Sequence, residues 1–475
     1  MIHFNRRLAT LLFTCSLTAL HAQNNSGKLI FVIPNAVDAH PQVGVSLKDT
    51  DPFRSADFGT VVGSDSNFGP VAGGLMRPFN IGIATQLSAL PIASPASGVI
   101  FREDPATGAS LPSAQSLGPI LTERAETIGK RRFYMGFTRQ QFRFNKLEGQ
   151  PLGNIQALDV GGVDTKILQD GVRQKTSPTT ADLQIDLRLD QNVAFFTYGL
   201  TNRLDVSTAL TWVNATVGAV ASNGRIVNTG DPTAGGTCWC AQTFSADSSR
   251  NTFNQDFGRS GFVLSGPFGR SHQTSTGIGD TLIRVKGTVL ERPSAAFALG
   301  ADVRIPTGDE LNYHGSGSTG FKPFAALSLH SRDLGIVRIS PHFNIGYQVN
   351  GKSLLAGDIF TNTKGDMPNI FSWSAGAGIS FSQRITFQAD ILGQTLLDAN
   401  RLVLTTVPGR GQNIAPATGV TLSPNKQNIQ MNSGAFGFKL KLAGNLVFST
   451  NMLVAFDDNG LRDRLVPLFG LGYTF

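Results

Sequence analysis

The sequence predicts an all-β protein: a transmembrane, antiparallel, up-and-down β-barrel of about twelve strands, preceded by an irregular N-terminal extension. Apolar and polar residues alternate along twelve segments, so each segment has one apolar and one polar face. Tight turns and long loops join these segments in alternation, which gathers the tight turns at one end and most long loops at the other, as in outer-membrane barrels. Charged residues make up 15% of the chain, below the roughly 25% usual for soluble domains.

Residues 1–22 have the pattern of a secretory signal peptide. Arg6 and Arg7 precede an apolar stretch, residues 8–20, which is too short to span a membrane as a helix. We expect cleavage after Ala22 and export of the mature chain through the inner membrane to the bacterial outer membrane. No later stretch reaches eighteen consecutive apolar residues, which excludes a helical membrane protein.

Residues 23–129 form the N-terminal extension. They lack regular alternation and are punctuated by Pro and Gly. A short hairpin is expected around residues 104–108 and a short helix from Pro119 to Ile128. We expect the segment either to fold into the pore as a plug or to remain a loosely ordered periplasmic arm.

The barrel is expected to comprise residues 130–475. In segment 131–145 the phenylalanines change parity between Phe137 and Phe142, which suggests a β-bulge near Arg139. Segment 181–199 has the clearest alternation, with apolar residues from Leu183 to Phe195 on one face and charged residues on the other. This pattern predicts lipid against the apolar face and water against the charged face.

Nine further segments repeat the alternation before the closing strand: 203–217, 277–290, 295–306, 321–331, 335–349, 370–382, 384–397, 432–442 and 445–457. The tight turns are expected at 201–203, 291–294, 332–335, 382–384 and 443–445, and the long loops at 146–180, 218–276, 307–320, 350–369 and 398–431. A hairpin within residues 71–92 would raise the number of strands to fourteen.

The closing strand runs from Leu465 to Phe475, with apolar and aromatic residues at every second position. In a soluble sheet so apolar an outer face would favour aggregation, whereas in a barrel it would contact the lipid bilayer. The ending also resembles the closing strand of bacterial outer-membrane barrels, and this resemblance implies recognition by the barrel-assembly machinery.

The polar faces are expected to line the lumen. Seven cations and seven anions share this parity, so the lumen has no single-sign field that would select ions strongly. The lumen-lining candidates are Asp186, Arg188, Asp280, Arg284, Lys286, Asp302, Arg304, Arg338, His342, Asp390, Lys439 and Lys441. We expect these charges either to pair and hold the wall, as Arg284 and Asp302 could across a tight turn, or to form a ladder for a substrate.

Other chemistry finds little support in the sequence. The glycine-rich stretch 315–320 matches a dinucleotide fingerprint but lies between two predicted strands, where it is expected to be a loop. Cys238 and Cys240 could form a disulfide or half a metal site in a loop. The net charge of +7 is not gathered into a basic cluster, so nucleic acid is not an expected partner. No catalytic arrangement, cofactor or metal site is expected.

Two motifs point to a family. Gly-Ile-Gly-Asp at 277–280 opens a strand that ends with Arg-Val-Lys at 284–286, and the next strand closes with Arg-Ile-Pro-Thr-Gly-Asp at 304–309. With Tyr-Gly-Leu-Thr at 198–201 and Leu-Asp-Val at 204–206, they resemble the outer-membrane channels of the MetA-pathway of phenol degradation type. The likeness covers residues 130–475 and leaves out the N-terminal extension.

The resemblance implies a channel or transporter for passive or facilitated passage of small, hydrophobic or aromatic solutes. The alternative is a surface-exposed interaction or structural barrel that acts through its long extracellular loops, above all 218–276.

Overall fold

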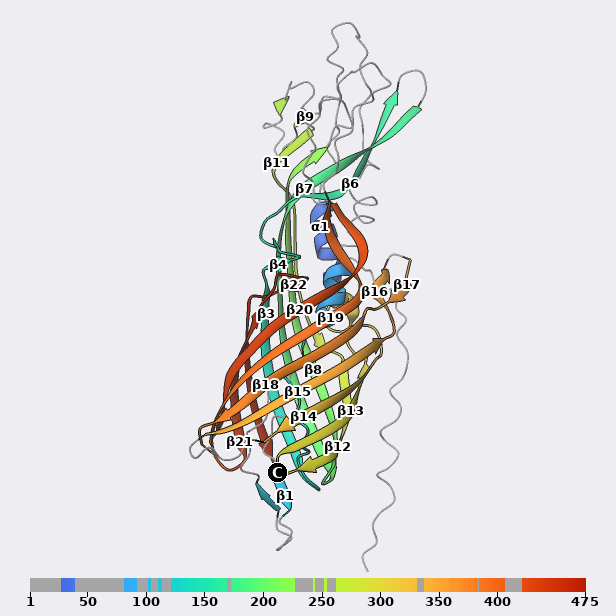
Figure 1. Ribbon diagram of the computed structural model, residues 1–475. Helices are drawn as coiled ribbons and strands as arrows, with labels where there is room; N and C mark the ends of the chain where they lie inside the picture. The colour runs from blue at the N-terminus through green and yellow to red at the C-terminus, as the bar shows by residue number, and fades with distance from the viewer. Residues whose placement is uncertain are drawn as a thin grey trace, which may run out of the picture.

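A closed barrel of twelve antiparallel strands forms the body of the protein (Figure 1). The computed structural model describes residues 27–38, 81–91, 101–103, 110–112, 121–168, 172–226, 242–243, 252–253, 262–330, 337–359, 361–382, 384–405 and 421–475. The barrel strands are β3 (Phe133–Phe144), β7 (Val172–Thr201), β8 (Leu204–Ile226), β12 (Thr281–Arg292), β13 (Ala295–Ile305), β14 (Gly320–Leu329), β15 (Arg338–Asn350), β18 (Asn369–Ser380), β19 (Ile385–Thr405), β20 (Thr421–Lys441), β21 (Leu446–Ala455) and β23 (Leu465–Thr474). The ring closes because β7 pairs with both β3 and β8. The predicted all-β, twelve-stranded barrel is confirmed.

Two further strands lie outside the ring. β6 (Ile155–Leu168) pairs with the first half of β7, and β11 (Phe262–Ile278) pairs with the second half of β8. The predicted alternative of fourteen strands, with a hairpin from residues 71–92, is wrong in its described part because residues 81–87 are helical.

The two ends of the barrel differ. The turns that follow β7, β12 and β20 are short, and the C-terminal Phe475 donates a 2.8 Å backbone hydrogen bond to Phe133 at the same end. We call this the turn end and the opposite one the loop end. In outer-membrane barrels the short turns face the periplasm. The tight turns predicted at 332–335 and around Gln383 lie wholly or partly outside the described residues.

The outer surface of the barrel is apolar. Exposed side chains on it include Phe137, Val285, Leu299, Phe343, Ile391, Phe438 and Leu471. At the turn end the rings of Phe133 and Tyr473 lie 5.9 Å and 4.6 Å from that of Phe475. An apolar band with aromatic residues at its rim is a favourable surface in contact with a lipid bilayer and an unfavourable one in contact with water.

The predicted bulge near Arg139 is absent. β3 pairs with β7 and with β23 without a register shift, and its alternation continues to its end. Phe142 and Phe144 are buried in the lumen, with ring centroids 5.7 Å apart, whereas Phe137 faces outward. The aromatic residues change parity because the inside of the barrel is itself apolar near the loop end.

The strand predicted most clearly, β7, is oriented the other way round, because its predicted lipid-facing side is buried from Leu183 through Val193 to Phe195. Leu183, Leu187 and Leu189 are buried inside, while Asp186 and Arg188 face outward as an exposed ion pair with 2.8 Å between Nη2 and Oδ2. The prediction that these two residues line the lumen is therefore wrong. At this height β7 has left the apolar band, so water solvates its outer face and protein fills the inside.

Most predicted long loops contain strands that continue the barrel wall. β7 begins at Val172, β8 runs to Ile226, and β19 and β20 stay paired as far as Thr405 and Thr421. Shorter strands occupy other connections: β4 (Lys146–Leu147), β5 (Gln150–Pro151), β9 (Gln242–Thr243), β10 (Thr252–Phe253), β16 (Lys352–Asp358), β17 (Thr363–Asp366) and β22 (Leu461–Arg462).

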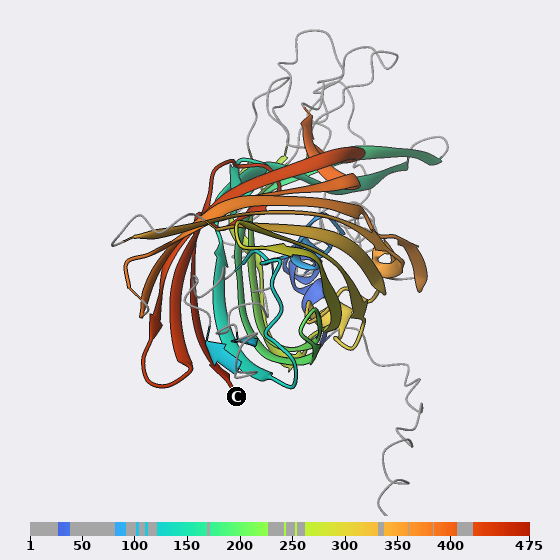
Figure 2. The same ribbon diagram turned by 60° about the horizontal axis from the view of Figure 1, so that its bottom comes forward.

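Three pieces of the N-terminal extension lie against the inside of the wall (Figure 2). The first inner segment, residues 27–38, contains a 3-10 turn η2 (Leu29–Phe31) and helix α1 (Val32–Asp38). The second, residues 81–91, is helical over 81–87, and the third, residues 121–130, is irregular. Leu29, Ile30 and Ile83 are fully buried in one core with the inward leucines of β7.

Other predictions for the extension can be compared with the structure. The predicted hairpin is present, since β1 (Phe101–Glu103) pairs with β2 (Ser110–Pro112). The helix predicted from Pro119 to Ile128 is wrong, because residues 121–129 form no helix. Within the described ranges, no helix is long and apolar enough to span a membrane.

A charged residue should be costly on the apolar band and tolerated on the outer face of β7 above it. Leu299→Arg, near the middle of β13, should lower the free energy of unfolding by about 2–4 kcal/mol. The matched change Gln184→Arg, on the exposed face of β7, should leave it nearly unchanged. Urea unfolding in lipid vesicles compares the two; equal losses would mean that the bilayer covers residue 184 as well.

Candidate functional site

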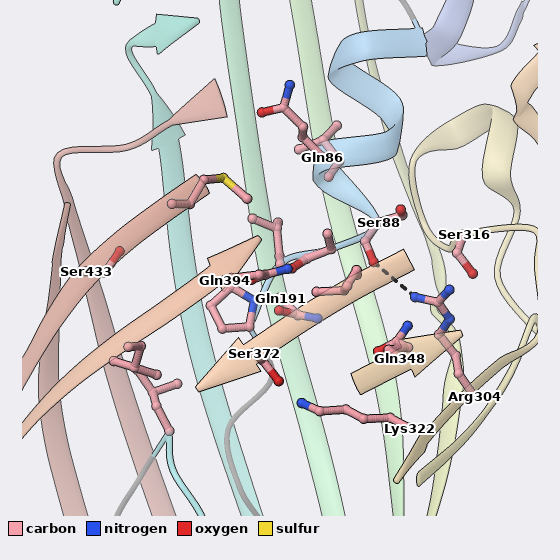
Figure 3. A pocket seen from close by; sticks show the side chains of 18 of the residues that line it. Gln86, Ser88, Gln191, Arg304, Ser316, Lys322, Gln348, Ser372, Gln394 and Ser433 are labelled. Atoms are coloured by element: carbon pink, nitrogen blue, oxygen red, sulfur yellow. Dashed lines mark hydrogen bonds between the residues drawn. The ribbon is translucent and has the colours of Figure 1, made fainter. Parts of the chain in front are cut away.

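A cavity of about 310 Å³ lies in the lumen between the second and third inner segments (Figure 3). One part of its lining is apolar and comes from β3, β7 and β8, with Phe142, Phe144, Leu189 and Val213. Another part is charged and comes from β12, β13 and β14, with Arg284, Asp302, Arg304 and Lys322. The cavity is therefore amphipathic.

The third inner segment is held to the wall through its backbone. Lys286 donates from Nζ to the carbonyl oxygens of Arg124 (3.0 Å) and Glu126 (2.8 Å), and Thr288 donates to that of Ala125 (2.6 Å). These wall groups satisfy carbonyls that a helix would otherwise pair internally.

The N–H groups of the same segment are also taken up by the wall. Glu123 N donates to Asn344 Oδ1 (2.7 Å), Ala125 N to Ser328 Oγ (2.9 Å) and Ile128 N to Asp205 Oδ2 (3.0 Å). The segment stays extended because its partners come from the barrel, which explains why the predicted helix is absent.

A buried ion-pair network joins the same segment to the wall. Arg284 donates to both oxygens of Asp302, at 2.6 Å and 2.8 Å, and its Nη1 also donates to Glu123. Lys286 donates to the other oxygen of Glu123 at 2.9 Å. The guanidinium of Arg284 lies 4.9 Å from the centre of the Phe324 ring. The pairing of Arg284 with Asp302 that the sequence suggested is present.

The second inner segment is anchored by backbone carbonyls near its end. Arg304 donates from Nη1 to Ser88 O (3.2 Å), and Gln394 donates from Nε2 to Ala89 O (2.9 Å). Earlier in the segment, Gln86 accepts from the backbone N–H of Leu461. These bonds fix the boundary of the cavity that faces the loop end.

The two glycine motifs act together to fold the loop between β13 and β14. Asp280 accepts from the backbone N–H of Ser316 (2.8 Å), from its hydroxyl (2.6 Å) and from Gly308 N (3.3 Å). A Cβ at Gly308 would lie 2.8 Å from Gly315 N, and a Cβ at Gly279 3.0 Å from His314 O. Close approach of the loop, not a left-handed backbone, requires these glycines.

Asp309, which ends the second motif, holds the first inner segment. It forms an ion pair with Lys28 at 2.7 Å and accepts from Asn312 Nδ2 at 2.9 Å. Burial opposes its charge, but the hydrogen bond and the charge of Lys28 outweigh that effect and lower the pKa of the Asp309 carboxyl. Asn312 also accepts from Leu29 N at 3.1 Å.

The remaining predicted lumen residues lie on inward positions outside the network. His342 Nε2 is 2.7 Å from Asp390 Oδ1, and both side chains are buried, as is Lys439. Arg338 and Lys441 are half-buried at the turn end of β15 and β20. Cys238 and Cys240 lie outside the described residues.

Four groups of the site were not predicted from the sequence: Glu123, Lys322 and the carbonyls of Ser88 and Ala89. Lys322 was predictable from the strand register, because it lies directly opposite Asp302 in the β13–β14 ladder. The inner segments gave no such signal, because an irregular backbone does not place alternate side chains on opposite faces.

A closed barrel with an apolar outer band and a polar, partly filled lumen defines a transmembrane β-barrel of the outer membrane. The family described as "Putative MetA-pathway of phenol degradation" matches residues 170–441, more than half of the chain. The chain belongs to this family, in agreement with the resemblance seen in its motifs.

Several solved structures are similar over most of their length. An outer membrane channel from Pseudomonas putida F1 has 8% identity and a TM-score of 0.40, with 74% of this chain and 98% of that chain covered. The toluene transporter TbuX of Ralstonia pickettii has 11% identity and a TM-score of 0.29, with 73% and 90% covered. No curated protein matches the chain.

Removing one partner from the buried network should be far more costly than removing one from an exposed pair. Arg284→Met leaves Asp302 without its partner in the lumen and should lower the free energy of unfolding by about 3–5 kcal/mol. Arg188→Met breaks the exposed pair with Asp186 and should cost about 0–1 kcal/mol. Urea unfolding of both variants checks this, and a small loss for Arg284→Met would contradict the network's stabilising role.

Proposed function

We propose that the protein is an outer-membrane channel for passive or facilitated passage of small hydrophobic or aromatic solutes, and that it is not an enzyme. The observation that carries the proposal is the amphipathic cavity inside the barrel. Its volume of about 310 Å³ suits a small molecule, and its apolar lining offers a surface on which such a solute can displace water. Family membership agrees with this reading.

We also propose that residues 23–129 restrict the pore and that residues 130–475 form the conducting wall. Three separated pieces of the extension bond to the barrel or to its β13–β14 loop: Lys28 to Asp309 of the loop, Ser88 to Arg304 and Glu123 to Arg284. A loosely ordered arm, the other expectation for this segment, would not make such bonds. Residues 1–22 remain a proposed signal peptide.

Two partners follow from this proposal besides the solute. The bilayer contacts the apolar outer band, and the barrel-assembly machinery would recognise the closing strand that ends at Phe475. The alternative role, a surface interaction through loop 218–276, would depend on a stretch around Cys238 and Cys240 that lies outside the described residues.

The channel proposal is tested by uptake of a radiolabelled small aromatic, such as benzyl alcohol, into intact cells. Cells that carry the barrel should take it up faster than cells without it, and Arg304→Ala should alter the rate because its bond to Ser88 bounds the cavity. Equal uptake with and without the barrel would overturn the channel proposal.

The plug proposal is tested by single-channel conductance in planar bilayers. Deleting residues 23–115 should raise the conductance several-fold, because the first and second inner segments leave the lumen. An unchanged conductance would favour the loose arm.

A point substitution tests the third inner segment separately. Ala125 is fully buried against Ala296, Ala298 and Ala326, so Ala125→Trp should force the segment off the wall and raise the conductance. Lys130→Trp, at an exposed position of the same segment, is the matched control and should have no effect.

A further inference from the structure

Lys322 is the one charged side chain of the cavity lining that makes no hydrogen bond or ion pair with the residues that the structure describes. It lies on the inner side of β14, half-buried, and Figure 3 shows its ammonium extending into the cavity. An ammonium removed from bulk water without a partner is costly, so its presence calls for an explanation.

The anions nearest to Lys322 are already engaged. Asp302, directly opposite it across the β13–β14 ladder, gives both of its oxygens to Arg284. Glu123 gives one oxygen to Arg284 and the other to Lys286. The ion pairs of these two acids within the described residues are with Arg284 and Lys286, and none is with Lys322. The network is complete without the lysine.

The other charged groups of the lining are also satisfied. Asp280 accepts from the loop at Ser316 and lies 3.7 Å from Arg304. Arg462 donates from Nε to Asp457 at 3.1 Å, and Asp463 accepts from the backbone N–H of Leu465. Lys322 therefore provides one positive charge that is available to a ligand.

The wall beside Lys322 makes room for its side chain. A Cβ at Gly346, on the neighbouring strand β15, would lie 2.7 Å from Lys322 Cε. Polar side chains of β15 and β18, Gln348 and Ser372, line the same part of the cavity. The apolar lining from Phe142, Phe144 and Leu189 belongs to the strands on another side of the ring.

We propose that the cavity binds a small amphipathic monoanion, an arene or short alkyl carboxylate, with the carboxylate on the Lys322 ammonium and the apolar body against the β3–β7 wall. The inference rests on the proposed channel function and narrows its solute class. A carboxylate would supply the charge-assisted hydrogen bond that Lys322 lacks, and a single negative charge matches a single available cation.

The test compares benzoate with benzamide, its uncharged analogue of nearly the same shape. Calorimetry on the purified, detergent-solubilised full chain should show benzoate binding about tenfold or more tightly than benzamide. Lys322→Met, which keeps an unbranched side chain of similar length and removes the charge, should abolish this preference while benzamide binding stays unchanged. Lys322→Arg should retain most of it.

Lys364→Met is the matched control, because Lys364 is exposed on β17 outside the cavity. It should bind both compounds as the wild type does. Heat-modifiable gel migration verifies that each variant is folded. If Lys322→Met does not fold, equal binding of the two compounds by the wild type still overturns the proposal, and Lys322→Arg tests the dependence on residue 322.

Different results would contradict the anion site and the channel proposal. Equal binding of benzoate and benzamide by the wild type, or a benzoate preference that survives in Lys322→Met, would overturn the anion site and leave the channel intact. If uptake of neutral aromatics by whole cells also fails, the channel proposal falls with it.

Discussion

The requirement that every backbone polar group find a partner inside a bilayer determines this structure. β7 pairs with β3 on one side and with β8 on the other, and these two pairings close the ring of twelve strands. Closure of the ring fixes which side chains face inward, and several of these inward side chains are charged and lie close together in the lumen. Those charges then need partners of their own, and the third inner segment supplies many of them through Glu123 and the carbonyls around it.

Much of the barrel was predictable because lipid imposes a simple pattern. Where both the bilayer and a wet lumen border the wall, as along β12 with Val285 outside and Lys286 inside, alternation identifies the strand and its faces. The alternation no longer tells which face of a strand is outside where folded protein, and not water, borders the inner face. On β7 the leucines from 183 to 189 are apolar because helical pieces of the N-terminal extension pack on them, and a two-residue period cannot distinguish lipid from folded protein.

The candidate site was predictable only in part, for a related reason. Arg284 and Asp302 come from adjacent strands joined by a short turn, so register alone brings them together. Glu123 contacts Arg284 although the two residues are 161 positions apart in the sequence. No periodic pattern around Glu123 predicts this contact. The glycines of the two motifs create the space in which Asp280 can receive the loop, and the sequence pattern alone does not indicate this role.

The hydrogen bonds of the third inner segment have a consequence for the order of assembly. Its partners Asp205, Ser328 and Asn344 lie 77, 203 and 221 residues later in the chain. These groups come from β8, β14 and β15, so the segment can complete its hydrogen bonds only when these three strands are present in the wall. Contacts so distant in sequence form slowly. The narrowing of the pore is therefore expected to be a late step of assembly, completed only after these strands have taken their places in the wall.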